Sequence, residues 1–193
     1  VDNSFVGTDY TNYPPLFKRI EDFDNNLHTV SICNWNPIND YIVQSHADYK
    51  LNVSSDADVS SEAVNYLSSN DPDFMFLHFD DVDHAGHADG FSPNVSQYIS
   101  AIEGVDAYIS PIMQSISQRP NYANEDWLIL ITTDHGGLGT SHGGNSIEEQ
   151  NIFVIASGNA IAQSTILADS NMIFDSVYNC LADTTELQFD GVD

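Results

Sequence analysis

Four short apolar runs constrain the fold of this chain most strongly. They span His28–Cys33, Phe74–Phe79, Trp127–Thr132 and Asn151–Ala156. Each run is apolar almost throughout and does not alternate with polar residues. This pattern is typical of strands that are buried on both faces of a parallel sheet.

Segments with helical periodicity lie between and around these runs. Ser60–Ser69 and Val95–Ser117 place apolar residues three and four positions apart, and we expect Pro111 to kink the second helix or to break it in two. A third helix is predicted over Met172–Leu181, and the segment Tyr10–Ile20 is predicted to contain a shorter helix that begins near Pro14. Ser54–Ser61 is polar and is predicted to be a surface loop. Strands that alternate with helices indicate an α/β fold, with a mainly parallel sheet flanked by helices. The length fits a single domain over residues 1–193.

The charge of the chain limits its partners. Twenty-nine acidic residues face four basic ones, which gives a formal net charge of −25. Such a chain repels nucleic-acid duplexes and anionic membranes. It contains no apolar run of the length that spans a bilayer, so we expect no membrane insertion. An anionic substrate would need a local positive charge, for which bound metal cations are the natural source.

Two segments rich in Asp and His follow predicted strands directly. The first contains Asp83 and His87, four residues apart, so that one helical turn aims both side chains at one point. The second contains the adjacent Asp134 and His135 and, beyond a glycine pair, His142. Imidazole and carboxylate are ligands that Zn²⁺ and similar cations prefer. A solvated pair is the simpler interpretation of either segment alone, but two such segments at strand ends predict a metal site.

The remaining histidines and the cysteines have other interpretations. His78 lies inside an apolar run and is predicted to be a hydrogen-bonded core histidine. Asp80 and Asp81 are expected to be turn or capping residues, although either could orient a ligand histidine. Cys33 and Cys180 are expected to be small core residues, and the sequence does not show whether they pair.

The order of these motifs resembles that of the alkaline phosphatase superfamily. Asp83-His84-Ala85-Gly86-His87, Thr133-Asp134-His135-Gly136 and Ser141-His142-Gly143 occur in the family's sequence order. The type I phosphodiesterases/nucleotide pyrophosphatases are the most similar group by motif. The resemblance implies a partial alkaline phosphatase-like fold, in which this chain is the C-terminal metal-binding part of a larger hydrolase domain.

The resemblance also implies a set of site residues. Two divalent metal ions, usually zinc, would be bound, one by Asp83, His87 and His142 and the other by Asp134 and His135. Asn3 would donate a hydrogen bond to a phosphoryl oxygen of the substrate. The Ser or Thr nucleophile and one further Asp ligand are expected upstream of Val1, so the missing N-terminal segment is an expected partner and no catalytic residue is assigned within the chain.

The implied activity is the metal-dependent hydrolysis of small-molecule phosphate esters, as in a phosphodiesterase, a nucleotide pyrophosphatase or a phosphatase. One alternative is a non-catalytic metal-binding or structural module that retains the fold. Another is a sulfatase-like hydrolase, which His135 disfavours because sulfatases usually have Asn at this position. Two Asn-Val-Ser sequons, at Asn52 and Asn94, are weak hints of secretion, and we favour an extracytoplasmic or secreted location.

Overall fold

The computed structural model describes residues 5–159, 161, 173–175 and 180–182 of the chain. The chain divides into two compact units, the first ending at Asn159 and the second beginning at Ala160. Each unit is described by itself below, and the single domain over residues 1–193 stays a prediction.

A three-stranded parallel sheet forms the centre of the first unit. It contains β1 (Thr29–Cys33), β2 (Tyr49–Asn52) and β3 (Phe74–His78) in the order β2-β1-β3. All five residues of β1 are buried, including the polar Thr29 and Ser31, as predicted for a strand covered on both faces. Strand β2 was not predicted. Its four residues alternate between half-buried and exposed positions at the edge of the sheet, so they do not form a continuous apolar run.

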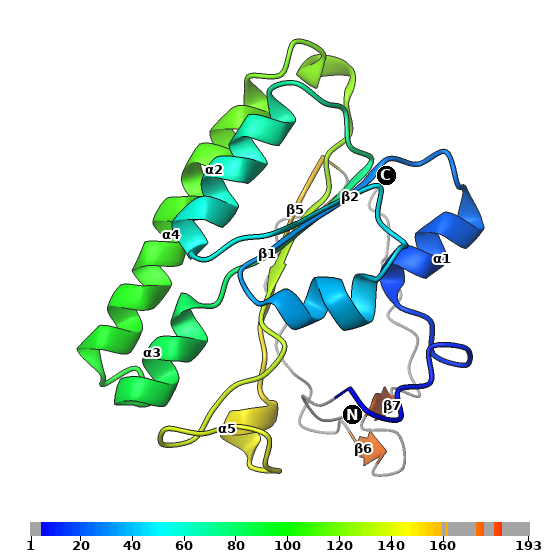
Figure 1. The fold of residues 1–193 in the computed structure, drawn as a ribbon. Coiled ribbons are helices and arrows are strands. Elements are labelled where there is room, and N and C mark those ends of the chain that lie inside the picture. The colour runs from blue at the N-terminus through cyan, green and yellow to red at the C-terminus, as the bar shows by residue number, and fades with distance from the viewer. Residues whose placement is uncertain (1–4, 160, 162–172, 176–179, 183–193) are drawn as a thin grey trace. The chain divides into compact units, whose positions relative to one another are not determined.

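Helices α2 (Asp56–Leu67) and α4 (Ser96–Ser117) lie side by side (Figure 1). Val59, Ala63 and Leu67 of α2 pack with Ile112 and Ile116 of α4. They share the core with Val30 and Ile32 of β1, both of which are fully buried. This apolar cluster fixes α2 and α4 against the sheet.

Helix α2 begins four residues before the predicted start at Ser60. The Ser55 hydroxyl accepts a hydrogen bond from the backbone N–H of Asp58 and caps the helix. The surface loop predicted over Ser54–Ser61 is therefore wrong, because its Ser/Asp composition is that of a helix N-terminus.

Helix α4 is one continuous element from Ser96 to Ser117, so Pro111 does not break it in two, and the alternative of a kink stays a prediction. Proline cannot donate to the carbonyl four residues earlier in the helix. In the same turn, the Ser60 hydroxyl of α2 donates a 2.7 Å hydrogen bond to the Tyr108 carbonyl. Ile112 and Ile116, which follow the proline, are buried in the core.

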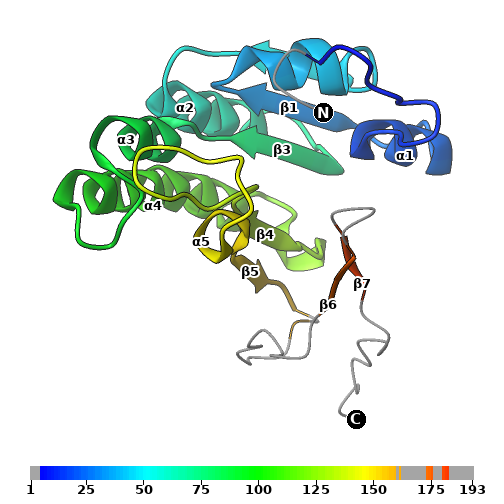
Figure 2. The same cartoon turned by 90° about the horizontal axis from the view of Figure 1, so that it is seen from below.

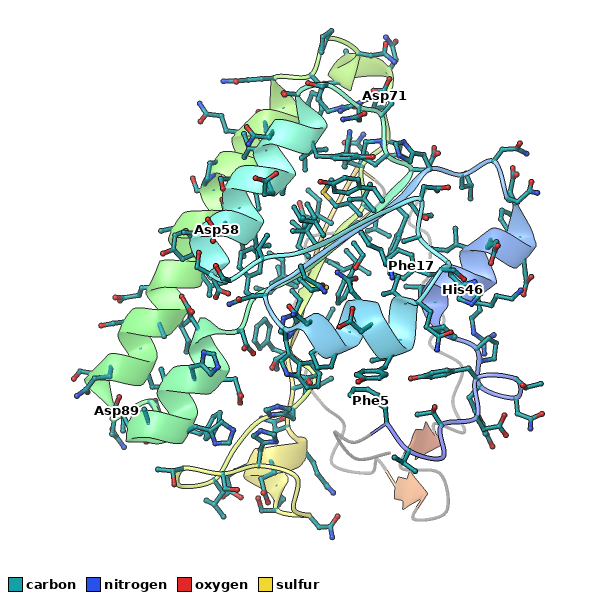
Figure 3. All side chains as sticks on the ribbon, in the orientation of Figure 1. Phe5, Phe17, His46, Asp58, Asp71 and Asp89 are labelled. Atoms are coloured by element: carbon teal, nitrogen blue, oxygen red, sulfur yellow. The ribbon has the colours of Figure 1, made fainter. Side chains whose placement is uncertain are left out.

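The other elements of the first unit surround this core. They are α1 (Leu16–Phe23), the π-helix η1 (Ile38–Val43), α3 (Asp81–Asp89), the 3₁₀ turn η2 (Tyr122–Asn124), β4 (Ile129–Thr132), α5 (Ile147–Gln150) and β5 (Val154–Ser157). Helix α1 confirms the helix predicted over Tyr10–Ile20, with later bounds. Its Phe17 points inward (Figure 3) and packs edge-on against Phe74 of β3, with ring centroids 5.2 Å apart.

Strands β4 and β5 form a separate antiparallel pair (Figure 2). Their apolar composition predicted burial on both faces, and this is wrong. Leu130 is 60% exposed and Val154 is 64% exposed. A run of apolar residues reports a preference for burial, but it does not show what covers the strand.

In the second unit, β6 (Ile173–Asp175) and β7 (Cys180–Ala182) pair as antiparallel strands. The helix predicted over Met172–Leu181 is therefore wrong in the part that the structure describes. Cys33 is a free, fully buried thiol, as expected of a core residue, whereas the side chain of Cys180 lies outside the description. None of the described helices is long and apolar enough to cross a membrane.

Candidate metal centre

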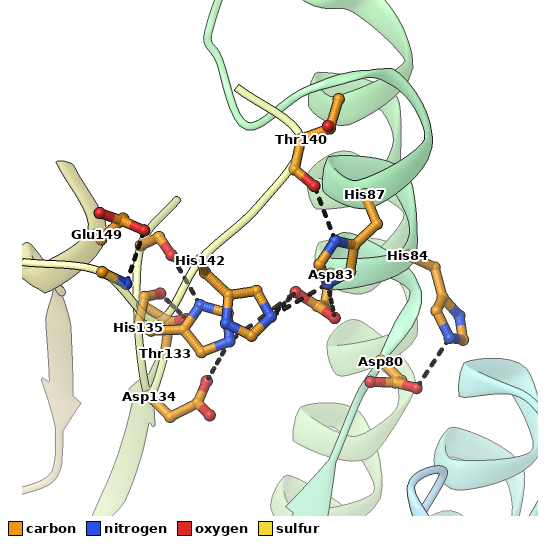
Figure 4. Close-up of polar contacts among 12 residues, drawn as sticks. Asp80, Asp83, His84, His87, Thr133, Asp134, His135, Thr140, His142 and Glu149 are labelled. Carbon is orange, nitrogen blue, oxygen red and sulfur yellow. Dashed lines mark hydrogen bonds and ion pairs between the residues drawn. The ribbon is translucent and has the colours of Figure 1, made fainter. Parts of the chain in front are cut away.

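Helix α3 supplies the first two side chains of the candidate site. It begins three residues after the end of β3, at the carboxyl edge of the parallel sheet, where α/β folds bind ligands. Asp83 and His87 lie one turn apart on the same side of this helix. The Asp83 Oδ2 and His87 Nε2 atoms are 3.4 Å apart (Figure 4), as the four-residue spacing predicts.

The loop after β4 supplies the other three side chains. Gly136 donates a 2.9 Å hydrogen bond from its N–H to the Glu149 carbonyl of α5, and a Cβ at this position would lie 2.0 Å from the Glu148 carbonyl oxygen. The Glu149 carboxylate accepts a 2.8 Å hydrogen bond from the Gly144 N–H and closes a capping box with Ser146. Helix α5 therefore holds both ends of the excursion that carries His135 and His142.

The two segments converge on Asp83. Its Oδ1 atom lies 3.5 Å from Nε2 of His142 and 3.9 Å from Nε2 of His135. The Nε2 atoms of His142 and His87 are 3.1 Å apart, and the rings of His142 and His135 stack with centroids 3.7 Å apart. Asp134 completes the set, with its Oδ1 3.8 Å from Nε2 of His135, although its side chain is largely exposed. All five predicted ligands thus meet in one cluster, and their division between two ions stays a prediction.

Backbone carbonyls fix the orientation of two of the imidazoles. The Nδ1 atom of His87 lies 2.9 Å from the Thr140 carbonyl oxygen, and that of His135 lies 2.7 Å from the Gly136 carbonyl oxygen. A carbonyl only accepts hydrogen bonds, so both Nδ1 atoms carry the proton. In the neutral rings the Nε2 atoms then present lone pairs toward the cluster, as ligand histidines do.

A divalent cation fits this arrangement. Asp83 Oδ1 is buried and has no hydrogen-bond partner among the described residues. A buried carboxylate oxygen without a partner is costly. Here it faces the Nε2 atoms of His135 and His142. Asp83, His135 and His142 offer ligand atoms that all lie within 4.8 Å of one another, which one ion can bridge.

Phe91, which was not predicted as a site residue, packs against this cluster. Its ring meets those of His87 and His142 edge-on, with centroids 5.4 Å and 6.0 Å away. A Cβ on Gly86 or on Gly137 would lie 2.2 Å from a carbon of this ring, so both positions require glycine. The Phe91 N–H also donates a 2.7 Å hydrogen bond to the Gly139 carbonyl. In the sequence, the only indication of a closely packed side chain was the glycine inside each motif.

Three other predicted residues have different outcomes. His78 ends β3, and its Nδ1 is buried with no hydrogen-bond partner in the described part of the chain, so the predicted hydrogen-bonded core histidine is wrong there. Burial lowers its pKa, against a weaker opposing effect of nearby carboxylates such as Asp80. Asp80 is the N-cap residue of α3, but its carboxylate pairs with His84 at 3.3 Å and does not cap the helix. Asn3 lies outside the described residues.

Comparison with known proteins adds two findings. The family model described as the metalloenzyme superfamily matches residues 16–148, which are more than half of the chain and include all five clustered side chains. A human protein, the catalytic subunit of GPI ethanolamine phosphate transferase 2, is 34% identical over 98 residues. The alignment covers 50% of this chain and 10% of that protein, so the chain spans about a tenth of the length of this relative.

Proposed function

The chain belongs to the metalloenzyme superfamily, and from this premise we propose that it supplies the metal-binding part of an enzyme that cleaves phosphate esters. The observation that carries the proposal is the meeting of five Asp and His side chains in one cluster, in which Asp83 Oδ1 is buried, has no hydrogen-bond partner among the described residues and faces His135 and His142. The acceptor of the phosphoryl-containing group would be water in a hydrolase. It would be another hydroxyl in a transferase, as the name of the human relative indicates for that protein.

The ligand set favours zinc, because three imidazoles and two carboxylates are its preferred nitrogen and oxygen donors. We propose that Asp83, His87 and His142 hold one ion and that Asp134 and His135 take part in holding a second. Bound divalent cations supply positive charge that polarises a phosphoryl oxygen and lowers the pKa of a coordinated hydroxyl.

The residues of the chain prepare this site in two ways. The Thr140 and Gly136 carbonyls keep the Nε2 atoms of His87 and His135 free of protons and aimed inward. Phe91 covers one side of the histidine cluster with an apolar ring, which limits the access of water there.

Charge supports a local role for metal ions. The chain carries a net charge of −25, so it repels a phosphate ester at long range. Only cations held in the cluster would attract the substrate over the last few ångströms. We further propose that the Ser or Thr nucleophile lies in a segment preceding Val1, that Asn3 contacts the phosphoryl group, and that the protein acts outside the cytoplasm on a small phosphate ester rather than on a nucleic-acid duplex.

Metal titration followed by an activity assay tests the proposal. Isothermal titration of the metal-stripped chain with Zn²⁺ should show binding that is lost in Asp83→Asn. The longer protein that includes the upstream segment should then hydrolyse bis(4-nitrophenyl) phosphate in a Zn²⁺-dependent manner, or transfer the group to an added alcohol. Absence of Zn²⁺ binding by the chain would overturn the proposal. Binding without turnover in the longer protein would favour the non-catalytic module.

A further inference from the structure

Asp56 is a fully buried carboxylate that does not belong to the histidine cluster. It lies in the first turn of α2 and accepts three hydrogen bonds. The donors are the backbone N–H groups of Asp80 and Asp81, at 2.8 Å and 2.9 Å, and the side-chain amide of Asn34, at 2.9 Å. No Lys or Arg pairs with it in the described part of the structure, so these N–H groups alone offset the cost of burying its charge.

Two of these donors begin the helix that carries the ligands. Asp80 is the N-cap residue of α3 and Asp81 its first residue, yet the Asp80 side chain makes no capping bond. The carboxylate of Asp56 takes that role from the neighbouring helix. It binds one oxygen to each N–H and adds a negative charge at the positive end of α3.

Helix α3 needs this support because it is intrinsically weak. It has only nine residues, with Gly86 in its middle and several Asp and His residues of low helix propensity. Isolated helices of this length are not stable in water. Asp83 belongs to the same first turn as the two N–H groups that Asp56 binds, so a displacement of that turn moves Asp83 relative to His135 and His142 of the other segment.

We propose that Asp56 is a positioning residue of the metal centre, which acts through the first turn of α3 to set the place of Asp83. Asn34, the residue directly after β1, fixes the Asp56 carboxylate in turn, so the end of the central strand is connected through one buried side chain to the ligand helix. The inference rests on the proposed metal-binding role of the cluster.

Cobalt titration of the full 193-residue chain provides the test, because the visible absorption of Co²⁺ reports ligand geometry as well as binding. Asp56→Asn keeps the size of the side chain but turns an N–H₂ group toward one of the two backbone donors. We expect a 10- to 100-fold weaker Kd for Co²⁺, as is typical when a partner of a metal ligand is lost, together with a changed d–d spectrum. Leu67→Ala, in the same helix and equally buried, is the control: its Tm falls while its Kd and spectrum stay those of the wild type.

The outcomes separate the two proposals. Wild-type Kd and spectrum in Asp56→Asn, even with a lower Tm, would overturn the positioning role while leaving the metal centre intact. No Co²⁺ binding by the wild-type chain would overturn both. If Asp56→Asn does not fold, Asn34→Ala removes one donor and keeps the carboxylate. It should weaken Co²⁺ binding several-fold in the same direction, and an unchanged Kd in this variant would also contradict the role of Asp56.

Discussion

The Nε2 atoms of His87 and His142 lie 3.1 Å apart, although the two residues are 55 positions apart in the sequence. The Thr140 carbonyl holds the proton of His87 on Nδ1, so its Nε2 presents a lone pair. The Nε2 atom of His142 is therefore the donor in this contact, and His87 is the acceptor. A cation held by both nitrogens would take the place of the shared proton.

Replacing His87 should abolish high-affinity metal binding. Loss of a partner of a ligand costs 10- to 100-fold in affinity, so loss of a ligand in His87→Ala should raise the Kd for Zn²⁺ by more than about 100-fold. His84, one turn away on α3, is the matched control because it is mostly exposed and pairs with Asp80 rather than with the cluster. Competition titration with a chromophoric chelator measures both variants. An equal loss in His84→Ala would show that helix α3, and not the ligand, is responsible.

The close approach of Phe91 predicts that Gly86→Ala is destabilising. The new methyl group would lie 2.2 Å from the Phe91 ring, and such overpacking costs about 1–3 kcal/mol. Gly104→Ala in α4 is the control, because its methyl group meets nothing within 4 Å and should stabilise the helix by about 0.4–1 kcal/mol. Urea unfolding measures both. The double variant Gly86→Ala/Phe91→Ala should lose less free energy of unfolding than the sum of the losses in the two single variants. Strict additivity of the losses would contradict the contact.

Arg119 should be a major determinant of stability. Its side chain is only 7% exposed, donates to the Glu125 carboxylate at 2.9 Å and to the Leu67 carbonyl at 3.0 Å, and also pairs with Asp71. Asp71 and part of Glu125 reach solvent, so they are not left as buried charges when the arginine is removed. Hydrogen bonds to a charged group contribute about 1.5–3 kcal/mol, so we expect a loss of about 2 kcal/mol in Arg119→Met. Thermal unfolding of Arg119→Met and of the exposed Arg19→Met tests this. An equal fall of the Tm in the two variants would contradict the prediction that Arg119 contributes more to stability than an exposed arginine.

The buried thiol of Cys33 predicts a loss of stability at alkaline pH. Burial raises its pKa from the ordinary value of 9.0 to about 11, with the Ser31 hydroxyl opposing weakly. The thiol therefore stays protonated in the folded chain where it ionises in the unfolded one. The contribution of this protonated thiol to the free energy of unfolding is fully present below about pH 9 and is lost as the pH rises through 11. The total loss is about 3 kcal/mol. Urea unfolding at pH 8 and 10.5 should show a larger loss in the wild type than in Cys33→Ala, and equal losses would refute this.

The sequence predicted those parts of the fold that depend on local pattern. Strands β1 and β3 follow from mostly apolar runs, and the juxtaposition of Asp83 with His87 follows from one helical turn. The contact between His87 and His142 followed from motif order and strand-end placement, not from spacing.

Features that depend on contacts between distant elements were not predictable in this way. Asp56 appears in the sequence as an ordinary residue of a Ser/Asp-rich stretch, and only the folded chain brings it to the start of α3. Phe91 follows the metal motif without any pattern that marks its place. The hydrogen bond from the Ser60 hydroxyl of α2 to the Tyr108 carbonyl of α4 joins residues 48 positions apart, so it has no local pattern.

The histidine cluster joins one segment that follows strand β3 of the parallel sheet to another that connects the two strands of the antiparallel pair. Without an ion, the two segments are connected by contacts such as the hydrogen bonds from Phe91 to Gly139 and from His87 to Thr140. A bound cation would add a cross-link between them. Chelation would then make the glycine-rich excursion around residues 136–144 easier for proteases to cleave, and saturation with metal would protect it.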